Sequence, residues 1–149
     1  MEENLLKEPI LELDRILQLI PQKPPFVMVD SLLEYNEKEG TTGFTIPADN
    51  ILVENDIFSE PGIIEHMAQS MSLWRGYQGF LSGLEKPKTG FIGAIKAVEI
   101  MELPKAGSKL TTYVEILQEF LNVTSVGART FDEEGNLLAT SEMKTVTVD

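Results

Sequence analysis

The sequence has no cysteine and only one histidine among its 149 residues. Without cysteine, disulfides, thiolate nucleophiles and zinc sites built on Cys ligands are excluded. One histidine is too few for a metal site built on several imidazoles. We therefore expect no metal site, and a secreted module held together by disulfides is excluded.

Basic residues are also scarce, with 12 Lys and Arg against 24 Asp and Glu, so the formal net charge is -12. Affinity for phosphate depends on clustered Lys and Arg, which disfavours nucleic acid and anionic membranes as partners. No apolar run approaches the ~20 residues that a membrane helix needs, and the opening MEENLLKEP is acidic and polar. These features predict a cytoplasmic protein that binds neither nucleic acid nor membrane.

The length predicts one domain over residues 1–149, with residues 1–9 as a polar N-terminal extension. Pro9 is well placed to open a short amphipathic helix, because apolar residues then recur at helical spacing until Pro21. This helix would lie against the rest of the domain through one face only.

The middle of the chain changes character several times. Residues 26–34 and the segment TTGFTI are β-branched and apolar and predict two strands, and the irregular pattern from 47 to 60 predicts a loop. Residues 63–82 lack alternation and are apolar on nearly every side through Met71. That pattern is typical of a long helix that is buried all round.

Everything after position 89 predicts strands. The segment FIGAIKAVEI is almost continuously apolar, as expected for a central strand, and KLTTYVEI alternates, with Thr112 on the same side as its apolar residues. Two further strand-like segments follow, separated by DEEGN. The order predicts an α+β fold in which a curved antiparallel sheet of about six strands wraps around one long central helix, with a short N-terminal helix beside it.

Three stretches of the sequence resemble one family. LQLIPQKPPFVMVDSLLE is similar to the Leu-Pro-His-Arg-x-Pro-Phe-Leu-Leu-Val-Asp opening of 3-hydroxyacyl-acyl-carrier-protein dehydratases, and PGIIEHMAQS is similar to their Pro-Gly-Val-Leu-Ile-Glu-Ala-Met-Ala-Gln helix start. TGFIGAIKAVEIMELPKAGSKLTTYVEI looks like the strand pair that follows, with its Pro-x-x-Gly turn. From about position 10 the chain resembles this family, closest to the dehydratase-like branch of aryl-polyene and related lipid pathways.

The resemblance implies the hotdog fold and a homodimer whose two sheets join edge to edge, with a substrate tunnel along the dimer interface. It also implies an acyl thioester as substrate, presented by an acyl carrier protein or as acyl-CoA. The phosphopantetheine arm belongs to that substrate, and no cofactor of the protein itself is expected. The reaction class would be that of a lyase in fatty acid or polyene biosynthesis.

The sequence departs from the family at both motif histidines. The family's catalytic histidine lies in a Gly-His-Phe-Pro-Gly loop ahead of the helix, whereas the corresponding ILVENDIFSEPG has none. The histidine that follows Leu-Pro is replaced by Gln22, and an amide neither gains nor loses a proton near neutrality. We interpret Gln22 and Asp30 as structural residues that close the turn and the strand end.

Dehydration of a 3-hydroxyacyl thioester needs a base at C2, an acid at the departing C3 hydroxyl and a donor to the thioester oxygen. Glu65, in an apolar wall, could act as the acid, because desolvation favours a protonated carboxyl. Gln69, four residues on, lies on the same helix face and could orient it. The backbone N–H groups of Gly62 and Ile63, at the helix start, could hold the oxyanion.

Three interpretations remain for the base. His66 is the neighbour of Glu65, but consecutive helical residues point about 100° apart, so a core or dimer-interface role is the alternative to catalysis. Glu65 could do both jobs, taking the C2 proton and delivering it to the hydroxyl. In the third interpretation no group acts as the base, and the site binds acyl chains without turnover. The structural alternative for Glu65 itself is a partner of the helix dipole or part of an N-terminal cap.

An acidic enzyme needs a local basic patch to meet an acidic carrier protein. Arg75, Lys86 and Lys88 fall at the end of the long helix and in the segment after it, and they are the candidates for phosphopantetheine or carrier contact. The alternative is that these three side chains are ordinary solvated charges.

The main functional hypothesis is therefore a 3-hydroxyacyl-thioester dehydratase that forms an enoyl thioester through Glu65. The alternative is a non-catalytic acyl-binding subunit or partner of an active hotdog homologue. An acyl thioesterase is a lesser alternative, because a carboxylate at a helix start can also direct water at a thioester.

Overall fold

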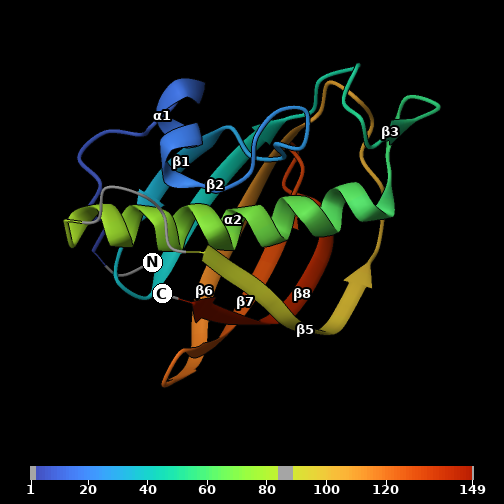
Figure 1. The fold of residues 1–149 in the computed structure, drawn as a ribbon. Helices are drawn as coiled ribbons and strands as arrows, with labels where there is room; N and C mark the ends of the chain where they lie inside the picture. The colour runs from blue at the N-terminus through green and yellow to red at the C-terminus, as the bar shows by residue number, and fades with distance from the viewer. Residues whose placement is uncertain (1–2, 84–88, 149) are drawn as a thin grey trace.

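The computed structural model describes residues 3–83 and 89–148 (Figure 1). Its elements in chain order are α1 (Leu13–Leu19), β1 (Ser31–Tyr35), β2 (Glu39–Thr45), β3 (Val53–Glu54), β4 (Ile57–Phe58), α2 (Glu60–Leu81), β5 (Thr89–Ile100), β6 (Lys109–Phe120), β7 (Val123–Phe131) and β8 (Leu137–Val148). Neither helix in these ranges is long and apolar enough to cross a membrane.

Six strands form one antiparallel sheet in the order β1-β2-β6-β7-β8-β5. The sheet curves around α2, which crosses its face, and α1 lies beside α2 (Figure 1). Along each strand the side chains alternate, so that Leu110, Thr112 and Val114 of β6 are buried toward the helix. The α+β prediction, with six strands around one long helix and a short N-terminal helix, is confirmed.

The long helix α2 supplies most of the central layer. It begins at Glu60, three residues earlier than the apolar pattern predicted, with Pro61 in its first turn where a missing N–H costs nothing. Its buried side chains include Ile63, Met67 and Trp74. At Gly76 the two helices touch through their backbones, since a Cβ there would lie 1.8 Å from the carbonyl oxygen of Leu19.

Two predicted boundaries in the middle of the chain were wrong. The strand expected over 26–34 begins only at Ser31, because the backbone of Met28 bonds to side chains of α2 instead of to a neighbouring strand. The loop expected from 47 to 60 contains the hairpin β3-β4. Its turn residues Asn55 and Asp56 have φ angles of 51° and 64°, the left-handed values that tight hairpin turns require.

The prediction of a central position for FIGAIKAVEI was also wrong. Within the described residues β5 pairs only with β8 and lies at the sheet edge. Ile92 and Ile95 are 40% and 50% exposed, although Ile95 is the cross-strand partner of the fully buried Met143 and so points to the same face. The apolar run indicates a surface that needs covering, and in this protomer nothing described covers it.

Candidate active site

Glu65 stands in the second turn of α2, half-buried, with its carboxylate held by its own helix. Its Oε1 accepts a hydrogen bond of 2.9 Å from Nε2 of Gln69. This is the contact that the four-residue spacing predicted. Among the described residues no basic side chain forms an ion pair with Glu65, so its partner is a neutral amide.

Gln69 is fully buried and ties α2 to the segment before β1. Its Oε1 accepts the backbone N–H of Met28 at 2.6 Å, and its Nε2 also donates to the carbonyl oxygen of Phe26 at 2.8 Å. Both amide donors are used, one on Phe26 and one on Glu65, so the amide can have only one orientation. Gln69 therefore presents an N–H to the carboxylate.

His66 is enclosed in the core. Its Nδ1 lies 2.7 Å from the carbonyl oxygen of Met28, and its Nε2 lies 2.7 Å from Oγ1 of Thr112. The ring stacks on Phe44, with centroids 5.8 Å apart. Burial lowers the pKa of His66 to about 4, although its hydrogen bond to Met28 opposes the shift. Because the imidazole is fully buried and both nitrogens are engaged, its geometry is that of the core histidine named above as the alternative to catalysis.

The two backbone donors predicted for an oxyanion differ in their availability. The N–H of Ile63 donates to the carbonyl oxygen of Ser59 at 3.1 Å, which is the first bond of the helix. The N–H of Gly62 belongs to the first turn, which has no intrahelical acceptor. A Cβ at Gly62 would lie 2.6 Å from the ring of Phe58, so only glycine fits there. Of the two predicted donors, Gly62 is the one left without a helical partner.

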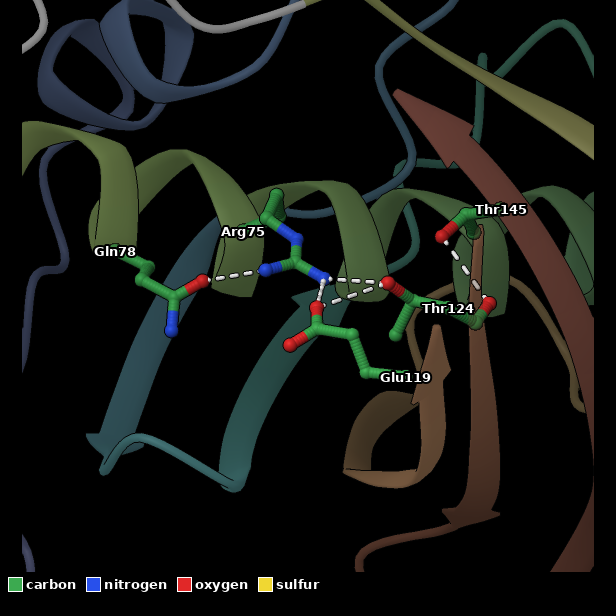
Figure 2. A network of polar contacts seen from close by, with 5 residues as sticks. All are labelled: Arg75, Gln78, Glu119, Thr124 and Thr145. Carbon is green, nitrogen blue, oxygen red and sulfur yellow. Dashed lines mark hydrogen bonds and ion pairs between the residues drawn. The ribbon is translucent and has the colours of Figure 1, made fainter. Parts of the chain in front are cut away.

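Arg75 joins α2 to the β6-β7 hairpin (Figure 2). Its Nη2 donates to Oε2 of Glu119 at 2.9 Å and to Oγ1 of Thr124 at 2.8 Å, and its Nη1 donates to Oε1 of Gln78 at 2.6 Å. The guanidinium also lies over the ring of Trp74, 4.9 Å from its centroid. The hydrogen bond from Arg75 is the main cause that lowers the pKa of Glu119.

Carrier contact by Arg75 stays a prediction, with the guanidinium committed to contacts within its own chain. Lys86 and Lys88, the other two candidates, lie outside the described residues. A basic patch at this end of α2 is therefore not tested.

A cavity of about 540 Å³ lies on the opposite face of the sheet from α2. Its lining includes the outward-facing Tyr113, Glu115 and Arg129, and it does not include Glu65. The tunnel that the resemblance implies beside Glu65 thus remains a prediction. Across residues 3–83 and 89–148 no three His, Asp or Glu side chains gather in a way that could hold a metal ion.

Two buried threonines, Thr112 and Thr130, belong to the surroundings of the site and were not among the predicted site residues. Thr112 and Thr130 are fully buried and lie 2.7 Å apart through their hydroxyls, and Thr112 also contacts His66. A signal for Thr112 existed, because the alternation of KLTTYVEI placed it on the buried side among apolar residues. A hydroxyl on that side needs a buried partner.

Comparison with known proteins identifies the family. The family model named ApeP-like and described as ApeP dehydratase matches residues 14–149. The chain belongs to the ApeP-like family. Relatives of this ApeP-like chain include the 3-hydroxyacyl-[acyl-carrier-protein] dehydratases FabZ of Helicobacter acinonychis and of Clostridium botulinum strain Okra. The first is 28% identical over 148 residues, covering 89% of this chain and 88% of the relative, and the second is 29% identical over 143 residues, covering 91% and 95%.

The fold of the ApeP-like chain also has solved counterparts. The dehydratase heterocomplex ApeI:P from Xenorhabdus doucetiae superposes with a TM-score of 0.81 at 18% identity, over 90% of this chain and 91% of that chain. At that identity the likeness concerns the fold alone. Together with the family match, it confirms the resemblance to hotdog-fold dehydratases.

Proposed function

We propose that this ApeP-like protein removes water from 3-hydroxyacyl thioesters carried on an acyl carrier protein, with Glu65 as the group that moves the proton. The observation that carries the proposal is the Glu65 carboxylate itself, half-buried at the start of α2 and oriented by the fully buried Gln69. The substrate class is taken from the FabZ relatives, which are named for it.

The reaction can be written with one carboxylate. Glu65 takes a proton from C2, the electrons of that bond form the C2=C3 double bond, and the C3–O bond breaks. The protonated carboxyl then gives its proton to the departing hydroxyl, which leaves as water. No electrons are gained or lost, so the proposal includes no cofactor beyond the phosphopantetheine of the substrate.

The hydrogen bonds of the site suggest which atoms face the substrate. Oε1 of Glu65 is engaged by Gln69, which leaves Oε2 for the proton transfer. The N–H of Gly62, at the positive end of α2, suits the thioester oxygen as negative charge develops on it. His66 takes no part as acid or base in this scheme.

The proposal includes a second hotdog subunit along β5. The exposed Ile92 and Ile95 would be covered by a strand added to this edge, and the unpaired backbone groups of the edge would be satisfied at the same time. A second copy of this chain is the simplest such subunit. The ApeI:P structure is that of a dehydratase heterocomplex, so a homologous but different subunit is the alternative. A cytoplasmic location belongs to the same proposal.

A second candidate function is that of an acyl-binding subunit without turnover of its own. It is favoured by the enclosure of His66 and by the absence of histidine from ILVENDIFSEPG, which together leave the chain without an accessible imidazole. Such a subunit would bind the acyl chain, and a partner subunit would supply the base.

The test compares the protein alone and mixed with a hotdog dehydratase that carries the loop histidine. Formation of the conjugated enoyl thioester from 3-hydroxyacyl carrier protein is followed by absorbance, and free thiol is measured in parallel. We expect activity from the protein alone, lost in Glu65→Gln and kept in Glu60→Gln, whose exposed carboxylate lies in the first turn of the same helix.

Activity that appears only in the mixture and is indifferent to Glu65→Gln would favour the second candidate. Release of free thiol without enoyl product would instead indicate a thioesterase, and would overturn both.

A further inference from the structure

A line of buried hydrogen bonds runs from the sheet into α2. The hydroxyls of Thr130 on β7 and Thr112 on β6 lie 2.7 Å apart, and Oγ1 of Thr112 lies 2.7 Å from Nε2 of His66. All three side chains are fully buried. Buried polar groups cost free energy unless each has a partner, so this line must be satisfied throughout.

The donor and acceptor of each hydrogen bond in this line follow from the Met28 carbonyl oxygen at its end. The carbonyl oxygen of Met28 can only accept, so Nδ1 of His66 carries the proton. Nε2 of the neutral ring then accepts from the hydroxyl of Thr112. Thr112 has given its only proton, and therefore Thr130 donates to it. Every donor and acceptor in the line is assigned.

Met28 connects this line to the candidate active site. His66 holds its carbonyl oxygen and Gln69 holds its N–H, at 2.7 Å and 2.6 Å. The Gln69 amide that accepts from Met28 is the one that donates to Glu65. A shift of Met28 would therefore move Gln69, and with it the carboxylate.

We propose that Thr112 and His66 are positioning residues for Glu65, acting through Met28 and Gln69. The inference rests on the proposed role of Glu65, but not on which chain supplies any further base. It gives the single histidine a function as a neutral, oriented spacer. The imidazole fixes the backbone that fixes the amide, and the amide fixes the carboxylate.

A second buried threonine provides the matched control. Thr42 on β2 is also fully buried, and its hydroxyl donates to Oγ of Ser70, which donates to the carbonyl oxygen of His66. This line ends on the helix backbone and does not reach Met28 or Gln69. Thr42→Val and Thr112→Val remove the same group at equal burial, and only the second is expected to disturb Glu65.

Two amide replacements of His66 each keep one of its two hydrogen bonds and remove the other. In His66→Asn the side-chain amide can still donate to Met28 from near the position of Nδ1, but it cannot reach Thr112. In His66→Gln the amide reaches toward Thr112 and leaves the carbonyl of Met28 without its donor. Thr112 holds the imidazole ring in its orientation, and the shorter amide of His66→Asn does not need that hold. We therefore expect His66→Asn to keep most of the activity and His66→Gln to lose most of it.

The kinetic readout is the division between kcat and KM. In Thr112→Val and His66→Gln we expect kcat to fall on the order of tenfold with little change in KM, a fraction of the ~100-fold that a 1 Å misplacement can cause. Thr42→Val should leave both constants near those of the wild type. Equal losses in the two threonine variants, or unchanged kcat in folded His66→Gln and Thr112→Val, would overturn the proposal. Loss in His66→Asn as complete as in His66→Gln would also overturn it.

A readout that needs no activity separates this proposal from the proposed function. The side-chain amide of Gln69 should give a hydrogen-exchange-protected NMR signal in the wild type, retained in Thr42→Val and His66→Asn and weakened in Thr112→Val and His66→Gln. If the wild type dehydrates nothing but this pattern holds, the proposed function fails and the positioning of Glu65 stands. If the signal is indifferent to all four changes, the positioning fails whatever the activity.

Discussion

The first half of α2 and the strand β5 depart from ordinary burial in opposite ways. In α2 the polar side chains of His66, Gln69 and Ser70 lie inside the core with almost no exposure. In β5 the apolar side chains of Ile92 and Ile95 lie 40% and 50% exposed at an edge. A buried polar group and an exposed apolar patch are the two observations that most often indicate function.

The two regions differ in whether the groups that contact their unusual side chains lie in the same chain. Each polar group of α2 named above has its hydrogen bonds within the chain, so the inner side of the candidate site is complete in one protomer. The apolar face of β5 has no cover among the described residues. The inner side of the candidate site is therefore complete within one chain, and in the proposed assembly a second subunit would cover the apolar face of β5.

The largest effect is expected from breaking the inner side at Gln69. Gln69→Leu removes the acceptor of the Met28 N–H and the donor to the Phe26 carbonyl. Leaving a buried polar group without a partner costs about 1–3 kcal/mol, so we expect unfolding in urea to show a loss of about 3 kcal/mol. The control is Gln18→Leu, because that exposed side chain on α1 accepts a hydrogen bond from Arg15 at the surface and its loss should cost roughly 0.5 kcal/mol. Equal losses in the two variants would contradict the special place of Gln69.

Acid should lower the free energy of unfolding through His66. The folded-state pKa of His66, about 4, is below its ordinary value of 6.5, so the unfolded chain binds the proton more tightly. Stability from the neutral ring is complete above pH 6.5 and is lost as the pH falls toward 4, by at most about 1.4 kcal/mol per pH unit. The measurement is the free energy of unfolding against pH, taken as the difference between wild type and His66→Asn. A difference that stays constant from pH 6.5 to 4 would show that the buried imidazole does not titrate in this way.

The third prediction concerns the exposed apolar face of β5. Ile95→Lys places a charge on the exposed apolar face of β5, and the loss of apolar contact should weaken association with a second subunit by about 1.5–3 kcal/mol. The protomer itself should stay folded, since half of the side chain already faces solvent. Sedimentation of wild type and variant measures the shift from dimer to monomer.

The control for this prediction is Leu11→Lys, because Leu11 is 66% exposed and far from β5 in the chain. It should leave the mass in solution unchanged. A dimer that survives Ile95→Lys would move the interface away from this edge.

The sequence was most informative where contacts are local. The apolar pattern located α2 to within three residues, and the four-residue spacing placed Gln69 against Glu65. The contact between Gln69 and Met28 joins residues 41 positions apart. No local pattern could reveal this contact. The apolar pattern of FVMVD therefore predicts a strand, whereas the backbone of Met28 bonds to side chains of α2.

The error at β5 has a different origin. A continuous apolar run indicates that both faces of a strand are buried. It does not indicate whether the residues that bury them belong to the same chain. On that pattern FIGAIKAVEI is expected at the centre of the sheet, whereas in the protomer it lies at the edge. For Thr112 the alternation gave the correct face, while its partners, His66 and Thr130, come from other elements.

The smallest effect is expected at the ion pair of Arg75 and Glu119, which belongs to neither region. Their side chains are 30% and 50% exposed, so solvent screens the pair, and such pairs are worth roughly 0–1 kcal/mol. Glu119→Gln should lower stability by less than about 1 kcal/mol, and the loss should shrink further in high salt. The control is Glu115→Gln, because that outward-facing carboxylate on the same strand forms no ion pair within the described residues. A loss at Glu119 as large as that at Gln69 would mean that the β6-β7 hairpin, and not the inner side of α2, holds the site in place.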